Sequence, residues 1–112
     1  MRRRPTIEAR SGETAIEIRA DERQILVEGR RAGLTAREFE LFALLADRPD
    51  RVFAREDLYE RLWGGAMPHR DRAVDVLVHR LRAKLLQASP GWRYVHTHFA
   101  VGYRYAPERA DG

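Results

Sequence analysis

The pattern of hydrophobic and polar residues in the first third of the chain is that of short strands. Ile16 and Ile18 alternate with polar neighbours, and residues 24–27 include a short apolar run. A period of two is typical of a strand with one buried face. The residues Glu28-Gly29-Arg30 are typical of a tight hairpin turn. We therefore expect a small antiparallel sheet within residues 6–34.

From residue 35 onward, the spacing of apolar residues changes from that of strands to that of helices. Thr35 is followed three residues later by Glu38, which predicts a capping box at the start of a helix that ends before Pro49. A second helix is predicted over residues 55–63, where two glycines end it. Val52-Phe53 before it forms a short extended link. These two helices are joined by short segments and precede a longer one.

The third predicted helix, residues 71–87, has two distinct faces. Four apolar residues form a single stripe that faces the core: Val74, Val78, Leu81 and Leu85. The opposite face is mostly basic or small: Arg72, Val76, His79, Arg80 and Ala83. A short helix, a loop and a longer helix with a basic face form a helix-turn-helix arrangement, whose last helix enters the major groove of DNA.

A β-hairpin is predicted directly after the third helix. Its strands cover residues 93–98 and 103–106, with a turn between them, and Pro107 closes the second strand. The expected fold is therefore an α+β winged helix-turn-helix. We expect these parts in chain order: a basic tail (1–5), a domain (6–106) made of a sheet (6–34), three helices (35–87) and a wing hairpin (92–106), and a C-terminal tail (107–112).

Charge is concentrated in one region of this 112-residue chain. Residues 69–104 contain seven basic and two acidic residues, whereas residues 1–68 contain thirteen of each. Such a segment favours a polyanionic partner, and a well-solvated surface is the alternative. The chain contains no cysteine, which excludes disulfides and thiolate sites, and no apolar run long enough to span a membrane. We expect a cytoplasmic protein that associates with the nucleoid when bound.

Several motifs in register resemble the OmpR/PhoB-type winged-helix output domain of bacterial transcription regulators. The resemblance covers roughly residues 14–106. It is carried by six segments: Leu34-Thr35-Ala36-Arg37-Glu38-Phe39-Glu40-Leu41, Arg55-Glu56-Asp57-Leu58, Leu62-Trp63-Gly64, Asp71-Arg72-Ala73-Val74-Asp75-Val76, Arg80-Leu81-Arg82-Ala83-Lys84-Leu85, and Val101-Gly102-Tyr103-Arg104-Tyr105.

The resemblance implies sequence-specific binding of double-stranded DNA. It implies base contacts by three residues: Arg80, Asp75 and Thr97. It also implies backbone contacts by six: Arg55, Trp63, Arg72, His79, Arg82 and Tyr103. Asp75 has two open roles, either orienting a neighbouring arginine or accepting from a cytosine amine. Members of the family bind direct repeats as head-to-tail pairs, so a homodimer on DNA is expected.

The wing turn departs from the family pattern. The arginine that enters the minor groove in relatives is replaced by Phe99, which follows His98. Three interpretations are open: Phe99 packs against sugars, His98 takes over part of the contact, or the wing touches no DNA. His79 stands where relatives often have a basic residue, so its phosphate contact would depend on pH.

Other partners and functions follow from the same comparison. In some relatives the loop at residues 64–71 contacts RNA polymerase, and most carry a receiver domain upstream, which is absent from this chain. A stand-alone protein and the C-terminal half of a regulator both fit the sequence. The alternative function is a winged-helix module that binds protein and has lost specific DNA binding.

No enzyme, metal or cofactor site is expected. The chain has no glycine-rich phosphate loop and no nucleophile or zinc-protease motif. His96 and His98 could share a metal, but no acidic or cysteine ligand stands beside them.

Overall fold

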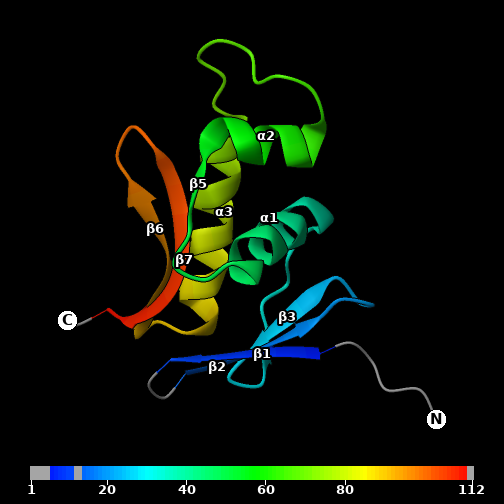
Figure 1. The fold of residues 1–112 in the computed structure, drawn as a ribbon. Coiled ribbons are helices and arrows are strands. Elements are labelled where there is room, and N and C mark those ends of the chain that lie inside the picture. Colours follow the sequence, from blue (N-terminus) through cyan, green and yellow to red (C-terminus); the bar gives the residue numbers. More distant parts are fainter. Residues whose placement is uncertain (1–5, 12–13, 111–112) are drawn as a thin grey trace.

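The structure, a computed structural model, describes residues 6–11 and 14–110. Three helices pack together with two antiparallel sheets, which confirms the predicted α+β winged-helix fold (Figure 1). The elements are β1 (Thr6–Ser11), β2 (Thr14–Arg19), β3 (Gln24–Val27), β4 (Arg30–Arg31), α1 (Ala36–Asp47), β5 (Val52–Ala54), α2 (Arg55–Trp63), α3 (Ala73–Ala88), β6 (Trp92–His98) and β7 (Gly102–Arg109). The predicted basic tail, residues 1–5, lies outside the described residues.

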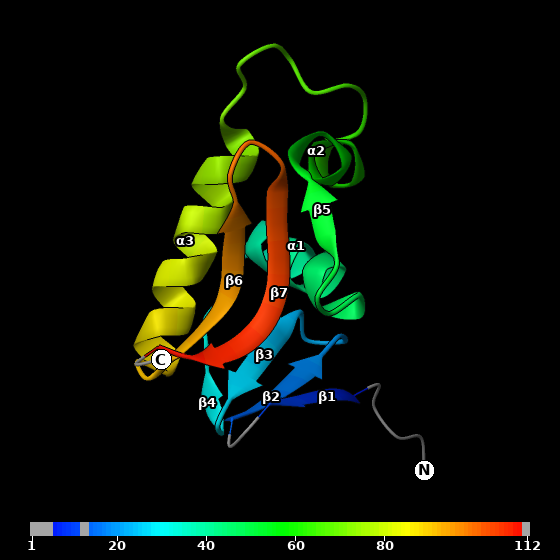
Figure 2. The same ribbon diagram turned by 60° about the vertical axis from the view of Figure 1, so that its left-hand side comes forward.

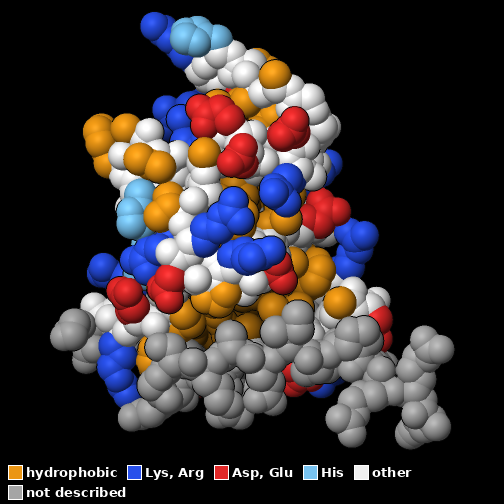
Figure 3. All heavy atoms as spheres, viewed as in Figure 1, with side chains coloured by type: hydrophobic (Ala, Val, Ile, Leu, Met, Phe, Trp, Pro, Cys, Tyr) orange, Lys and Arg blue, Asp and Glu red, His pale blue; other side chains and the backbone are white. Residues whose placement is uncertain are grey.

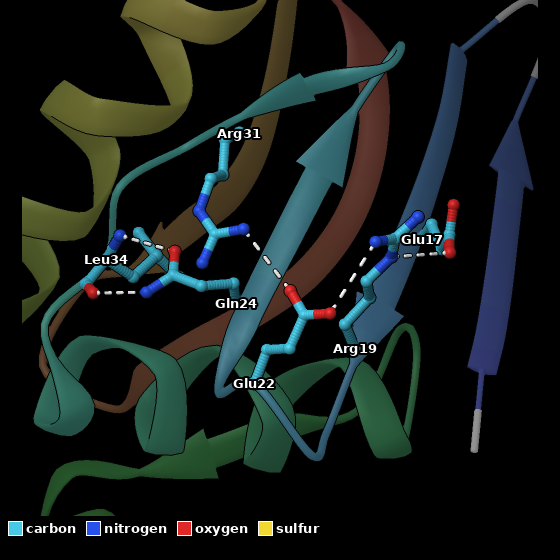
Figure 4. A network of polar contacts seen from close by, with 6 residues as sticks. All are labelled: Glu17, Arg19, Glu22, Gln24, Arg31 and Leu34. Atoms are coloured by element: carbon cyan, nitrogen blue, oxygen red, sulfur yellow. Dashed lines mark hydrogen bonds and ion pairs between the residues drawn. The ribbon is translucent and has the colours of Figure 1, made fainter. Parts of the chain in front are cut away.

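The N-terminal sheet has the strand order β1-β2-β3-β4. Polar contacts join its strands to one another and to the segment before α1. The carboxylate of Glu22 pairs with Arg19 at 3.6 Å and with Arg31 at 3.2 Å (Figure 4). The side-chain amide of Gln24 donates to the carbonyl of Leu34 at 2.8 Å and accepts from its backbone N–H at 3.0 Å. This amide pair holds the sheet against the segment that leads into α1.

Helix α1 begins with the predicted capping box. The Thr35 hydroxyl accepts from the backbone N–H of Glu38 at 3.2 Å, and the Glu38 carboxylate accepts from the Thr35 N–H at 2.8 Å. The helix is apolar around much of its circumference, so it lies inside the core, where Phe42 meets Tyr105 edge to face at 5.3 Å. The capping prediction is confirmed.

Helix α3 is displaced slightly from its predicted bounds. It begins at Ala73 rather than at Asp71, because the Asp71 carboxylate accepts from the backbone N–H of Ala73 at 2.7 Å and so lies before the helix. It ends at Ala88, one residue later than expected. The predicted core stripe is confirmed, and a fifth apolar residue is buried beside it: Val74, Val78, Leu81 and Leu85, with Leu77.

The second sheet contains the wing and has the order β5-β7-β6. The segment expected to be a short extended link is its third strand, with Phe53 opposite Tyr103. The prediction that Pro107 closes the last strand is wrong, since β7 continues to Arg109. Proline is tolerated there because β5 pairs only as far as Arg104 and the β6–β7 register shifts opposite Pro107.

The elements expected to meet DNA gather at one end of the molecule. Helix α3 runs beside the wing, and its N-terminus lies near the turn between β6 and β7 (Figure 2). The loop at residues 64–70 projects from the same end, whereas the N-terminal sheet lies at the opposite end (Figures 1 and 2). The fold therefore brings α2, α3 and the wing together.

Candidate nucleic-acid interface

One face of α3 is exposed and carries the predicted base-reading residue. The side chains opposite the core stripe are open to solvent: Arg72, Val76, His79, Arg80 and Ala83. Within residues 6–11 and 14–110, Arg80 makes no hydrogen bond or ion pair. Its guanidinium is therefore available for a bidentate contact with an external acceptor, such as guanine O6 and N7.

Asp75 lies on the flank of α3 and contacts three side chains. One comes from α2, one from β7 and one from the residue just before α3. Arg55 at the start of α2 donates from Nε at 3.0 Å and from Nη2 at 2.7 Å, one bond to each carboxylate oxygen. The Tyr103 hydroxyl on β7 donates at 2.5 Å, and Arg72 pairs at 3.0 Å. We call these four residues the Asp75 cluster.

The electrostatics of the Asp75 cluster favour the ionised carboxylate. Burial opposes its charge, but hydrogen bonds from Tyr103 and Arg55 hold the pKa of Asp75 below its ordinary value. Burial and the bond to Asp75 raise the pKa of Tyr103 to about 12. The hydrogen bond to Asp75 raises the pKa of Arg55. Tyr103 therefore stays protonated and Asp75 stays ionised at neutral pH.

Arg82 connects α3 to the wing. Its Nε donates to the Val95 carbonyl at 3.1 Å and its Nη2 to the Thr97 hydroxyl at 2.5 Å, and its guanidinium lies 5.6 Å from the Tyr103 ring centroid. These contacts fix β6 relative to the helix. The Thr97 hydroxyl can still donate its own proton, so its contact with DNA stays a prediction, as does that of Arg82.

The wing tip is apolar. Phe99 is 93% exposed and Val101 is 54% exposed. Hydrophobic side chains form the projecting tip in Figure 3, where Figure 1 places the β6–β7 turn. The Val101 N–H donates to the His98 carbonyl at 2.9 Å and closes the turn, while the His98 ring accepts from Arg104 at 2.9 Å.

Trp63 is the last residue of α2, and its ring contacts residues other than those of the Asp75 cluster. Its ring stacks on Tyr59, with centroids 5.1 Å apart, and the Arg37 guanidinium lies 5.1 Å from its centroid. The side chain is 38% exposed, so the ring is partly open to solvent. Its predicted phosphate contact stays a prediction.

The structure thus brings together some of the predicted site residues and separates others. Arg55, Arg72, Asp75 and Tyr103 are in direct contact, whereas Arg80 stands apart on the open face. Sequence reasoning missed the pairing of α2 with α3 through Asp75, because no local pattern relates residues twenty positions apart. Val76 lies on the same exposed face as Arg80, as helical spacing predicts, but it is not among the predicted site residues.

The part of the chain that the structure describes contains no group of three or more His, Cys, Asp or Glu side chains that could hold a metal ion. None of its helices is both long and apolar enough to cross a membrane.

Comparison with known proteins places the chain among transcription regulators. The family described as "Transcriptional regulatory protein, C terminal" matches residues 29–105. The DNA-binding response regulator MtrA of Mycolicibacterium smegmatis is 37% identical over 92 residues, which are 82% of this chain and 40% of that protein. The transcriptional regulatory protein YclJ of Bacillus subtilis is 39% identical over 84 residues, covering 74% of this chain and 36% of that protein.

Solved structures agree with the sequence comparison. The DNA-binding domain of Klebsiella pneumoniae RstA, in complex with the RstA box, has a TM-score of 0.74 at 28% identity and covers 88% of this chain and 96% of that one. The DNA-binding domain of E. coli CpxR has a TM-score of 0.76 at 28% identity, over 90% and 95% of the two chains. The chain spans about 40% of the length of MtrA. It belongs to the family of transcriptional regulatory protein C-terminal domains, the OmpR/PhoB-type winged helices.

Proposed function

We propose that this chain binds double-stranded DNA sequence-specifically as the DNA-binding domain of a bacterial transcription regulator, with α3 in the major groove. The family membership and the relatives that bind DNA support this function class. The observation that carries the mechanism is the exposed face of α3, on which the Arg80 guanidinium has no partner within the described residues. A free guanidinium on an exposed helix face suits guanine, and phosphate contacts beside it fix the register.

The remaining basic residues of the site differ in how they are held. Arg72 and His79 are exposed, and this supports contacts with phosphates. Arg55 donates two hydrogen bonds to Asp75, and Arg82 donates to the Val95 carbonyl and the Thr97 hydroxyl. We therefore propose that these two mainly fix the angles of α2 and the wing. Val76, 45% exposed on the α3 face, is suited to a thymine methyl group.

Further partners belong to the same proposal. Two copies occupy direct repeats head to tail, the loop at residues 64–71 is a contact for RNA polymerase, and a receiver domain acts upstream of this domain in the regulator. The exposed loop, which projects from the DNA-facing end, supports the polymerase contact (Figure 1). We propose the cytoplasm as the location, on the nucleoid.

Selection of duplexes from a random library at near-physiological salt tests the proposal. We expect a direct repeat with half-sites about 10–11 base pairs apart, one helical turn of DNA. Arg80→Ala should weaken binding to the selected duplex about 5- to 150-fold, since a bidentate guanine contact contributes about 1–3 kcal/mol of discrimination. The matched control is Arg61→Ala, an exposed α2 arginine beside the groove between α1 and β2, which should change affinity less than twofold.

Failure to enrich any sequence, with binding that vanishes as salt rises, would contradict specific recognition. The exposed Phe99 would then favour the alternative, a module that binds protein through the wing. Arg80→Ala would leave binding of such a partner intact, which separates the two functions.

A further inference from the structure

We propose that Asp75 is a positioning residue for DNA recognition: it holds Arg72 in the free protein and releases it to a backbone phosphate only when α3 is seated correctly. The inference rests on the DNA-binding function proposed above. It concerns the cluster at the N-terminal end of α3, where α2, α3 and β7 meet.

The partners of Asp75 are held unequally. Arg55 makes two hydrogen bonds to the carboxylate, and its side chain is 30% exposed. Arg72 makes one ion pair at 3.0 Å, and its side chain is 76% exposed. A two-bond contact in a partly buried position is stronger than a single exposed pair, which solvent and salt weaken. Arg72 is therefore the partner that a competing anion would remove.

Removing Arg72 does not leave Asp75 without partners. Arg55 still binds both carboxylate oxygens, and the Tyr103 hydroxyl still donates to one of them. The buried charge thus remains neutralised, so the exchange avoids the cost of an isolated ion. The same bonds keep α2 and the wing in place while Arg72 moves.

A shallow groove at this position supplies room for the phosphate. It lies between the start of α3 and the wing, and Arg55, Arg72 and Asp75 line one side, with Thr97 and Phe99 on the other. Its cavity volume is about 300 Å³. Arg72, which lines this groove, also belongs to the exposed face of α3. Its occupant is the sugar–phosphate backbone of the duplex that α3 reads.

The negative charge of Asp75 raises the preference for the correct DNA sequence over other sequences. It repels a phosphate that approaches in a wrong register, and it competes for Arg72 in every weak encounter complex. A seated duplex offers a phosphate at hydrogen-bond distance and takes Arg72 from the carboxylate. Asp75 therefore lowers non-specific affinity more than specific affinity.

Affinities of the full chain for the selected duplex and for a scrambled duplex test this inference. Asp75→Asn should tighten binding to the scrambled duplex about threefold to tenfold, tighten binding to the selected duplex less, and so lower the specificity ratio at least about twofold. Its log–log salt slope on the scrambled duplex should become steeper by about 0.9, one added phosphate contact. Asp47→Asn, which removes one exposed negative charge at the end of α1, is the control and should change both affinities less than twofold.

Tyr103→Phe separates positioning from charge, because it deletes one hydrogen bond to Asp75 and leaves every charge in place. It should weaken binding to the selected duplex about threefold to tenfold more than binding to the scrambled duplex, and leave the salt slope on the scrambled duplex unchanged, because no charge is removed. Equal changes on both duplexes in either variant would overturn the inference, since a purely structural loss lowers both affinities together.

Side-chain NMR of the unaltered protein keeps the test decisive if a variant fails to fold. On addition of the selected duplex, the Nε–H signal of Arg72 should shift while that of Arg55 stays in place. An Arg72 signal that does not move, or one that moves together with Arg55, would overturn the inference. If the unaltered chain selects no sequence, the proposed function itself fails; if it selects one and Asp75→Asn keeps the same specificity ratio, only the role of Asp75 fails.

Discussion

The hydroxyl group of Tyr105 is a polar atom buried without a partner. Among the side chains that the structure describes, it is the only buried nitrogen or oxygen atom that lacks a hydrogen bond. Burial raises the pKa of this phenol, so it is neutral at physiological pH. The ring fills the core beside Phe42, whereas the hydroxyl only carries a desolvation cost.

Tyr105→Phe should therefore leave the free energy of unfolding unchanged or raise it by about 1 kcal/mol, because it removes an unsatisfied group and keeps the ring. Urea unfolding monitored by circular dichroism measures the change. A loss of more than about 1 kcal/mol would mean that the hydroxyl has a bound partner, such as an internal water.

Glu38 is a buried carboxylate with two roles, closing the capping box and pairing with Lys84 at 2.6 Å. Burial alone would raise its pKa, but hydrogen bonds from Lys84 and from the Thr35 backbone hold the pKa below its ordinary value of 4.5. A carboxyl group whose pKa is depressed by folding stabilises the native state above its unfolded pKa. That contribution is lost as the pH falls through the folded-state value.

Glu38→Gln should thus lower the free energy of unfolding by about 2 kcal/mol at pH 7, the contribution of hydrogen bonds to a charged group. The difference from the unaltered protein should shrink as the pH falls below about 4.5. Urea titrations at pH 7, 5 and 3.5 measure it. A difference that is the same at all three would assign the effect to packing rather than to charge.

At the scale of elements, the close approach of β5 and β7 depends on Gly102. A Cβ atom at this position would overlap the carbonyl oxygen of Phe53 and lie 2.7 Å from its carbonyl carbon, both in the backbone of β5. Backbone atoms cannot move aside as the end of a side chain can. The strand pairing therefore needs a residue without a side chain at this position.

Gly102→Ala should lower the free energy of unfolding by about 2–3 kcal/mol, as expected for overpacking in a folded core. Gly91→Ala is the control, since a Cβ at Gly91 meets no atom within 4 Å, and it should change stability by less than about 0.5 kcal/mol. Thermal unfolding of both variants measures the difference. Equal stabilities would show that β5 can separate from β7 without cost.

The elements that the sequence predicts well are those whose signals are local. The capping box at Thr35 and the apolar stripe of α3 need only residues within a few positions, and the structure confirms both. Strand β5 has three residues, too few for a period, and its partner lies about fifty residues away. Its place in the wing sheet is a consequence of tertiary packing.

The same distinction applies to the candidate site. Helical spacing is enough to place Arg80 on the open face of α3. The partners of Asp75 come from α2 and β7, so their convergence depends on how the helices and the wing pack. The sequence leaves two roles open for Asp75, and both stay predictions; the structure adds its contacts with Arg55 and Arg72.

At the scale of the whole molecule, the surplus of positive charge predicts how binding depends on salt. The chain has 21 basic and 17 acidic residues. We expect about four to six phosphate contacts per copy, which gives a log–log salt slope of roughly −4 to −5 at about −0.9 per contact. Fluorescence anisotropy over a range of potassium chloride concentrations measures the slope. A slope shallower than about −2 would contradict this footprint.

The position of β7 in the middle of the sheet β5-β7-β6 has a consequence for biosynthesis. The strand that joins the other two is made last, so β5 and β6 leave the ribosome before their shared partner exists. A chain that stops before Gly102, through a nonsense mutation or proteolysis, keeps α3 and its arginines but has two strands with unpaired edges. Unpaired edges favour aggregation and degradation. Synthesis of β7 therefore decides whether this sheet forms or the domain becomes a substrate for proteases.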